Sequence, residues 1–358
     1  MTRLVFATDL HLTEGQGGLD PFTTDLQEIA ALEPDLLVMG GDICLWEPGA
    51  GDHLQRLLDK APFPSLCVMG NHDTNRHHPH RQDGTLGGEF DSEFVARFTA
   101  RNAYVGLGDA HVLTLNTCRM QPEYDDWRNV RAEVIEQDLE WLDATLTSLD
   151  RSIPLLLFVH IPLATTYPER RSADAATTDV WRVVNADSVF ERLSAWPAPV
   201  VVGQGHLHEN EHLYRDNVHL VSSGAVCGKW WNQGDETRCP DDIPRGWLIV
   251  DVQDSDVRLD YHAARHPDWR GEIIPRTDGV KGDWLNLFFG DAAEPVDVQI
   301  DGDWVRLPRA TPVAVDETFF SVHHWPLPSG FSGDTIQVRT SLRGQVVDLG
   351  SIQRRGTT

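Results

Sequence analysis

The sequence of 358 residues is poor in basic side chains, with 30 Lys and Arg against 55 Asp and Glu, a formal net charge of −25. Long nucleic acids and anionic lipid surfaces are bound through clustered Lys and Arg. The charge balance therefore argues against both as partners. A small anionic substrate is not excluded, because a bound metal ion would be the largest local charge in its site. The simplest interpretation of the acidic excess itself is solubility.

Long apolar runs are also missing. No stretch of 18 apolar residues and no signal-peptide core is present, so we expect no membrane insertion and a cytoplasmic protein. The five cysteines are odd in number and fit no zinc-ribbon spacing, which favours free thiols in a reducing compartment. They are Cys44, Cys67, Cys118, Cys227 and Cys239. The sequence leaves the oligomeric state open, including an oligomer.

Short apolar runs alternate with helix-like segments through residues 1–262, the pattern of an α/β domain. The runs that we expect to form buried strands are 4–7, 35–39, 65–69, 155–159 and 199–202. Two segments, 23–32 and 130–149, have apolar residues at helical spacing. In the second segment, the residues that can face one core are Val134, Ile135, Leu139, Leu142 and Leu146.

The pattern changes after residue 262. Residues 263–280 are rich in Pro, Arg, His and Asp, and we expect them to form a linker. Residues 281–358 contain short alternating runs separated by turn signals such as Asp301-Gly302-Asp303. This pattern is typical of a small all-β sandwich. We therefore predict an α/β domain over 1–262 and a β-sandwich-like domain over 281–358.

Nearly every predicted strand of the first domain ends in a polar cluster. The clusters are Asp9 and His11, Gly41-Asp42, Gly70-Asn71-His72-Asp73, His160, and Gly205-His206-Leu207-His208. In open α/β sheets, ligands bind just outside the carboxyl ends of the strands. We therefore expect these side chains to converge although they are spread over 200 residues of sequence.

Together these clusters predict a metal site. The seven candidate ligands are Asp9, His11, Asp42, Asn71, His160, His206 and His208. Carboxylates, one amide oxygen and imidazoles without a thiolate set suit divalent Mn, Fe or Zn. Two such ions about 3.5–4 Å apart lower the pKa of a bridging water and clamp the oxygens of a phosphoryl group. Each cluster alone could equally be a turn, a helix cap or a pair of loop histidines; the prediction depends on all five in this order.

The order of these motifs resembles the calcineurin-like metallophosphoesterase superfamily, and is most similar to class III cyclic nucleotide phosphodiesterases and their bacterial relatives. The stretch Gln137-x-x-x-Trp141-Leu142 also resembles a helix common in that family. The resemblance covers about residues 3–262. It implies a four-layer α/β/β/α sandwich, here followed by a small C-terminal all-β domain.

The resemblance also implies roles for the site residues. Those expected at the first metal are Asp9, His11 and His208, with Asn71, His160 and His206 at the second and Asp42 bridging the two. His72 would contact the phosphate or protonate the leaving oxygen, and Asp73 would orient its ring. An imidazole with a carboxylate partner suits general-acid catalysis at neutral pH.

Two further segments are candidates for binding substrate. Arg76 and His77 lie in the most basic stretch near the predicted site, residues 75–81, which could equally be a solvated loop. Trp230 follows Lys229 and could form an aromatic wall for a base or head group. Its alternative is packing against the C-terminal domain.

We therefore expect a phosphodiesterase that hydrolyses a small phosphate diester, with cyclic nucleotides among the candidate substrates, by attack of a metal-bridging hydroxide. A phosphomonoesterase on the same site and a non-catalytic scaffold on the same fold remain alternatives. The intact His72 argues against the scaffold. The lack of an Arg- or Lys-rich groove argues against a nuclease acting on long nucleic acid.

Overall fold

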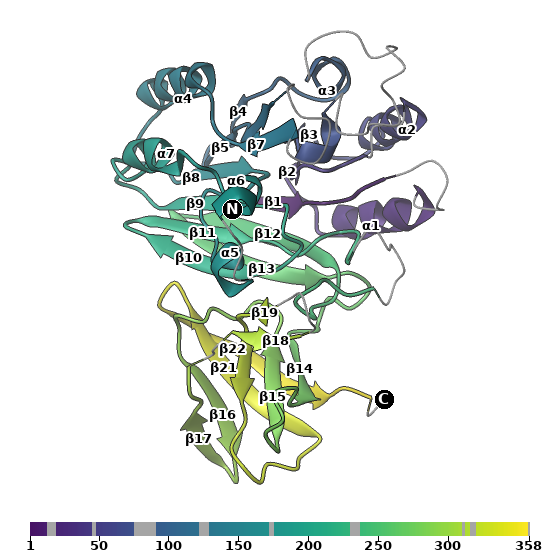
Figure 1. The fold of residues 1–358 in the computed structure, drawn as a ribbon, viewed down its shortest axis with the longest axis vertical. Coiled ribbons are helices and arrows are strands. Elements are labelled where there is room, and N and C mark those ends of the chain that lie inside the picture. The colour runs from purple at the N-terminus through teal and green to yellow at the C-terminus, as the bar shows by residue number, and fades with distance from the viewer. Residues whose placement is uncertain are drawn as a thin grey trace.

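The computed structural model of the chain describes residues 1–12, 19–44, 48–74, 91–121, 129–171, 175–229, 237–309, 312–315 and 320–356. An α/β part comes first along the chain, and an all-β part lies at its other end in Figure 1. This confirms the fold class predicted from the sequence.

The first sheet has five strands in the order β13-β12-β1-β2-β3. Its strands are β1 (Thr2–Ala7), β2 (Leu36–Met39), β3 (Ser65–Cys67), β12 (Gly246–Gln253) and β13 (Asp256–Ala263). β1, β2 and β3 are parallel, while β12 runs antiparallel to β1 and to β13. The ends of β1, β2 and β3 therefore meet at one edge of the sheet.

The second sheet has six strands in the order β10-β11-β9-β8-β5-β4. Its strands are β4 (Ala103–Gly106), β5 (His111–Thr114), β8 (Leu155–Val159), β9 (Val200–Gln204), β10 (Glu211–Arg215) and β11 (Val218–Ser222). The central strands β5, β8, β9 and β11 are parallel, and β4 and β10 are antiparallel edge strands. β6 (Cys118–Met120) and β7 (Val130–Ala132) form a separate two-stranded ribbon.

Most helices connect strands of these sheets. They are α1 (Leu19–Ala31), α2 (Pro48–Leu58), α3 (Ser92–Arg97), α4 (Glu136–Ser148), α5 (Tyr167–Arg170), α6 (Ala175–Trp181) and α7 (Ala186–Leu193). The helix predicted over 130–149 begins only at Glu136, because the β-branched residues before it form β7 and an extended entry. Among the described residues, no helix has both the length and the apolar character needed to cross a membrane.

The two sheets pack face to face around an apolar layer. The rings of Phe6 from β1 and Phe158 from β8 lie 4.9 Å apart between them. Further buried members of this layer are Leu4, Val38, Leu156, Val201 and Leu248. The outward-facing strand residues pack against helices, for example Val5 and Leu37 with Leu26 and Ile29 of α1. The layers are therefore helix, sheet, sheet, helix.

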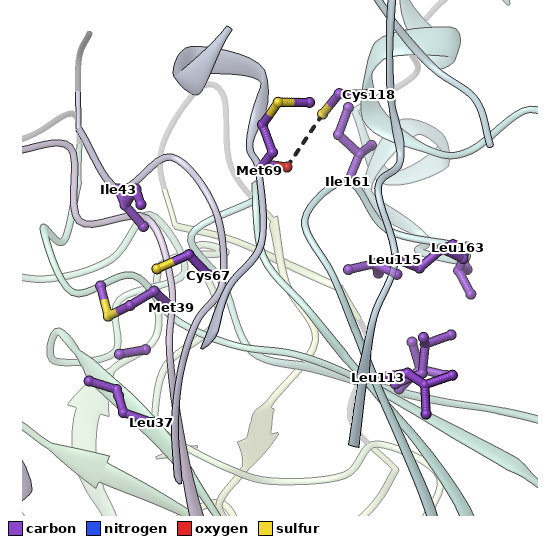
Figure 2. Packing of buried hydrophobic residues seen from close by; sticks show 14 of the residues in the cluster. Leu37, Met39, Ile43, Cys67, Met69, Leu113, Leu115, Cys118, Ile161 and Leu163 are labelled. Carbon is purple, nitrogen blue, oxygen red and sulfur yellow. Dashed lines mark hydrogen bonds between the residues drawn. The ribbon is translucent and has the colours of Figure 1, made fainter. Parts of the chain in front are cut away.

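Apolar side chains continue up to the strand ends where the polar clusters lie. Figure 2 shows Leu37, Met39 and Cys67 of β2 and β3 on one side and Leu113 of β5 on the other. Between them, the thiol of Cys118 lies 3.8 Å from the carbonyl oxygen of Met69, to which it donates a hydrogen bond. All five cysteines are free, as the sequence predicted, and the structure shows that all five are buried.

The C-terminal part is one seven-stranded sheet in the order β17-β16-β21-β22-β14-β15-β20. Its strands are β14 (Gly271–Pro275), β15 (Asp283–Leu287), β16 (Val296–Ile300), β17 (Asp303–Arg306), β20 (His324–Pro326), β21 (Thr335–Leu342) and β22 (Gln345–Arg354). β18 (Val313–Ala314) and β19 (Phe320–Ser321) form a small ribbon. The all-β prediction is confirmed, but the sheet curls around its own core, including Ile273, Trp325 and Val338, instead of facing a second sheet.

The linker predicted over 263–280 is shorter in the structure. β13 ends at Ala263, and β14 already begins at Gly271 within the predicted range. β14 pairs with β15 and β22, and Ile273 is buried in the C-terminal core. The Pro- and Arg-rich composition concealed this short strand, although its partner β15 is the next strand along the chain; its other partner, β22, lies far away in sequence.

A buried ion pair joins α1 to the segment before β12. Both amino groups of Arg245 contact the carboxylate of Asp25, at 2.8 and 2.9 Å, and both side chains are 1% exposed. Removing one partner of a buried pair leaves an uncompensated charge, which costs roughly 3–5 kcal/mol. We therefore expect Asp25→Ala to lower the free energy of unfolding by about this amount in urea denaturation.

A matched surface pair gives the control. Arg215 and Asp187 also lie 2.7 Å apart, but their side chains are 45% and 80% exposed. Asp187→Ala should change stability by less than about 1 kcal/mol, since exposed pairs contribute little. Equal effects of the two substitutions would contradict a structural role for the buried pair.

Candidate metal centre

The predicted polar residues come together at the carboxyl ends of the parallel strands. Asp9 follows β1, Asp42 follows β2 and Asn71 follows β3 in the first sheet. In the second sheet, His160 directly follows β8, and the loop after β9 carries His206 and His208. Because the two sheets face each other, their strand ends border the same region.

Asp42 lies at the centre of the cluster. Its Oδ2 atom is 3.2 Å from Nε2 of His160 and 3.6 Å from Nε2 of His11. The same oxygen is 3.9 Å from Nε2 of His72. A carboxylate within reach of imidazoles on both sides has the position that a bridging ligand needs.

The other donors divide into two groups around this carboxylate. On one side, Oδ1 of Asp9 lies 3.2 Å from Nε2 of His208 and 3.9 Å from Nε2 of His11. On the other side, Oδ1 of Asn71 lies 3.1 Å from Nε2 of His160. One ligand atom each from His160, His206 and Asp42 lie within 4.8 Å of one another. The assignment of these residues to two separate metals stays a prediction.

Three of the histidines are oriented by hydrogen bonds on the side away from the cluster. In each, the outer ring nitrogen lies 2.8–2.9 Å from a backbone carbonyl oxygen. The pairs are His160 Nδ1 with Gly40, His206 Nε2 with Val180, and His208 Nδ1 with Gly228. When the outer nitrogen donates its proton in this way, the inner nitrogen can offer a lone pair, which is the usual arrangement of metal-binding histidines.

The backbone at the cluster is strained. Five candidate ligands have positive φ angles between 48° and 74°: Asp9, His11, Asp42, His206 and His208. Residues other than glycine seldom adopt this left-handed conformation, and the strain is retained where side-chain positions matter to function. Here the left-handed backbone conformation turns the side chains of these residues toward the metal-ligand cluster.

Electrostatics favour the metal-binding form of Asp9, His11 and His206 but not of every donor. Burial opposes ionisation of Asp9, but the adjacent His208 outweighs it and lowers the pKa of this carboxyl to about 2. Burial lowers the pKa of His11 to about 3 and that of His206 to about 4. Charged carboxylates and neutral imidazoles are the forms that coordinate divalent metals.

The pKa values of two other histidines are raised instead. Against the effect of burial, Asp42 raises the pKa of His160 to about 9. Cys227 and Asp9 likewise outweigh burial and hold the pKa of His208 well above its ordinary value. A metal must therefore displace a proton from each of these two rings.

The residues present fit two divalent metal ions. Oδ1 of Asp9 is buried and makes no hydrogen bond with any described residue. A buried charged oxygen without a hydrogen bond is costly unless a cation compensates it. The donor set of carboxylates, one amide oxygen and imidazoles suits Mn, Fe or Zn and does not choose among them.

His72 lies at the rim of the cluster. Its side chain is 18% exposed, and its ring meets that of His11 edge-on with the centroids 5.0 Å apart. Its backbone nitrogen donates a hydrogen bond of 2.7 Å to Oδ1 of Asp42. The backbone of His72 therefore supports the central carboxylate, while its partly exposed ring borders the cluster beside His11.

Asp73 is engaged by the backbone of the neighbouring loops. Its carboxylate accepts hydrogen bonds from the backbone nitrogens of Gly70 at 2.9 Å, Ile43 at 3.1 Å and Cys44 at 3.2 Å, while its expected role of orienting the ring of His72 stays a prediction. Burial, together with the charge of Asp42, raises the pKa of Asp73 to about 7. Asp73 holds the loops after β2 and β3 together.

Other contacts around the cluster carried no signal in the sequence. The hydroxyl of Thr8 donates to Oδ2 of Asp9 at 2.7 Å, and the ring of Trp181 lies 5.4 Å from that of His206. The predicted substrate-binding residues Arg76, His77 and Trp230 lie outside the described residues. Their roles remain predictions.

The C-terminal part also reaches the loop that carries the last two histidines. Asn210, two residues after His208, donates its backbone nitrogen to Oδ2 of Asp241 and its side-chain nitrogen to the carbonyl oxygen of Phe288. Nε2 of His323 lies 2.9 Å from the same carboxylate oxygen of Asp241. The loop is therefore fastened to residues from both parts of the chain.

Comparison with known families agrees with this geometry. The model of calcineurin-like phosphoesterases matches residues 2–210, more than half of the chain. The chain belongs to this family. A second family model, described as the C terminal of calcineurin-like phosphoesterase, matches residues 221–325 of this chain.

Individual relatives of this calcineurin-like phosphoesterase are distant. A 3′,5′-cyclic-nucleotide phosphodiesterase from Nostoc sp. is 23% identical over 247 residues, which is 66% of this chain and 83% of the relative. A dimetal phosphatase from Danio rerio has a similar fold, with a TM-score of 0.51 and 13% identity over 73% of this chain and 95% of that one. A purple acid phosphatase from Lupinus luteus has a TM-score of 0.45 and 14% identity, covering 74% of this chain and 52% of that one.

Gly41 gives a test of the histidine geometry. Its φ is +95°, and a Cβ atom there would lie 2.4 Å from Nδ1 of His160. We expect Gly41→Ala to displace the His160 ring from Gly40 and weaken metal binding about 10–100-fold, the range for lost outer contacts. Metal affinity can be measured by competition with a chelating dye.

Gly108→Ala is the matched control. Gly108 also has a positive φ, +77°, but a Cβ atom there would meet nothing within 4 Å. This variant carries the backbone strain without the collision, so its metal affinity should match that of the unaltered protein. Equal losses of metal affinity in both variants would show that the collision with the His160 ring does not cause the loss.

Proposed function

We propose that the protein is a dinuclear-metal-dependent phosphodiesterase acting on a small phosphate diester. The observation that carries the proposal is the position of Asp42 between two groups of donors, with the ring of His72 at the exposed rim. A non-catalytic scaffold would have no use for strained loops and oriented histidines, because it needs them neither to bind a partner nor to fold. Family membership supports the same class of reaction.

The metal pair supplies Lewis-acid stabilisation of the phosphoryl oxygens and lowers the pKa of a bound water. The chain's own contribution is to hold the donors in place. Asp42 would bridge the ions, with the roles of the other six ligands as the family resemblance implies. His72 would contact a phosphoryl oxygen and give its Nε2 proton to the leaving oxygen.

The substrate proposal rests on weaker grounds than the reaction class. Cyclic nucleotides are the leading candidate because the relative from Nostoc sp. is a 3′,5′-cyclic-nucleotide phosphodiesterase. The net charge of −25 disfavours long nucleic acids. Arg76 and His77 would contact the phosphate, and Trp230 would face a base. The second candidate is a phosphomonoesterase, since the same metal pair can serve both esters.

The first test compares a diester with a monoester. We expect metal-stripped protein to be inactive and to hydrolyse bis(p-nitrophenyl) phosphate faster than p-nitrophenyl phosphate once Mn, Zn or Fe is restored. Release of p-nitrophenolate gives the rates, and 3′,5′-cyclic nucleotides are assayed next by chromatography. Cleavage of the monoester alone would replace the proposal with a phosphatase. Two bound ions without cleavage of any of these esters would favour the scaffold.

A second test addresses His72. Its backbone nitrogen, which binds Asp42, remains in His72→Ala, so we expect unchanged metal content in this variant. Loss of a general acid should lower kcat about 10²–10⁴-fold. The loss should be larger for an alkoxide leaving group than for p-nitrophenolate, which leaves readily without a proton. Equal losses for both leaving groups would assign His72 to phosphate binding alone, and undiminished activity would remove it from the mechanism.

A further inference from the structure

A second cluster of potential ligands lies where the α/β part meets the C-terminal part. It consists of His212 on β10, His219 on β11 and Asp291 in the loop between β15 and β16. The three residues are 7%, 2% and 1% exposed. One ligand atom from each lies within 4.8 Å of the others, and none of the three belongs to the groups at the candidate metal centre.

The β10–β11 hairpin brings the two imidazoles together. Tyr214 pairs with His219 and His212 pairs with Val221, so both histidines project from the same face of the hairpin. Nδ1 of His212 lies 3.0 Å from Nε2 of His219. Burial lowers the pKa of His212 to about 4 and holds that of His219 well below its ordinary value. Both rings are therefore neutral, the form that binds metal ions.

The spacing of the two nitrogens matches a shared cation. Two Zn–N bonds of about 2.0–2.1 Å place their nitrogens about 2.9 Å apart at a right angle and about 3.4 Å apart at a tetrahedral angle. The observed 3.0 Å lies between these values. Without an ion, one proton between the rings must serve both nitrogens.

The carboxylate of Asp291 is held as a third ligand would be. The hydroxyl of Tyr214 donates to its Oδ2 atom at 2.7 Å, and the backbone nitrogen of Ala293 donates to Oδ1 at 2.8 Å. Each oxygen keeps a further lone pair. Hydrogen bonds of this kind orient ligating carboxylates in metal sites.

The cluster also has access to solvent. A cavity of about 510 Å³ lies against β10 and is lined by His212 and Tyr214 together with Arg170, Ala293 and Arg309. Its walls come from both parts of the chain. His212 is the one proposed ligand that lines this cavity, which gives an ion a route to the cluster from that side.

We propose that His212, His219 and Asp291 bind a divalent metal ion of the Zn²⁺ class, separate from the candidate dinuclear centre. Two imidazoles and one carboxylate are a ligand set that such ions accept. The ion would connect the β10–β11 hairpin to the C-terminal sheet. Its role would then be structural, fixing the cavity and the position of the two parts.

Metal content tests the proposal. Purified protein is loaded with Zn²⁺, freed of excess by gel filtration, and analysed by mass spectrometry for zinc per chain. We expect His219→Gln and Asp291→Asn each to lose one equivalent of zinc relative to the unaltered protein. Chelator should lower the melting temperature of the unaltered protein more than that of either variant, because only the former has this ion to lose.

His111→Gln provides the control. His111 is also buried in the second sheet, where its ring nitrogens contact Tyr104 and the carbonyl oxygen of Asp150, away from the cluster. This variant should keep the full zinc content. Identical zinc content in all three variants would overturn the proposal and leave the histidines as a neutral pair that docks the C-terminal sheet.

A measurement on the unaltered protein tests the site even if the variants fail to fold. Crystals soaked in Zn²⁺ should show an anomalous-scattering peak among His212, His219 and Asp291. Absence of that peak, with peaks present at the dinuclear centre, would also overturn the proposal. Because the two sites share no ligand, neither result depends on whether the protein cleaves a phosphate ester.

Discussion

The structure depends on keeping the Asp42 carboxylate charged where water does not reach it. Asp42 is 2% exposed, and burial alone would neutralise it. His160 and His72, together with His11, outweigh that penalty and hold the pKa of Asp42 well below its usual value. Two bound cations would strengthen the same balance. The two sheets bring their loops together so that these histidines surround one carboxylate. The glycines in the loops allow the close approach.

Close approach of the loops makes this placement possible. A Cβ atom at Gly70 would lie 2.1 Å from Oδ1 of Asp42, and one at Gly205 would lie 2.1 Å from the hydroxyl oxygen of Thr8. Glycine is therefore required where loops approach closely, both between neighbouring strands of the first sheet (Gly70 and Asp42) and between the two sheets (Gly205 and Thr8). The motifs that carry ligands contain glycine for this reason, which is why they can be recognised in the sequence.

The sequence predicted strands and ligand motifs, which depend on neighbouring residues. It did not predict contacts between segments that are far apart along the chain. The apolar run 155–159, which precedes His160, is recognisable as a strand from its composition alone. The ligand motifs were found because each follows such a run. The composition around β14 resembles that of a linker, and its place inside the sheet also depends on β22, which comes much later in the chain than its hairpin partner β15. The hydrogen bonds of Asp73 to Ile43 and Cys44, and the meeting of His219 with Asp291, likewise arise only when separate segments pack together.

The C-terminal part takes a direct part in holding the metal-ligand loop. Both ring nitrogens of His323 face acceptors at 2.9 Å, Oδ1 of Asn286 and Oδ2 of Asp241. The amide nitrogen of Asn286 donates to the carbonyl oxygen of Asp242, so its Oδ1 must accept from the histidine. His323 therefore links Asn286 of the C-terminal sheet to the buried Asp241. Since Asp241 also accepts a hydrogen bond from the backbone of Asn210, removing the C-terminal sheet would take away a partner of the residue that holds the loop carrying the last two histidine ligands.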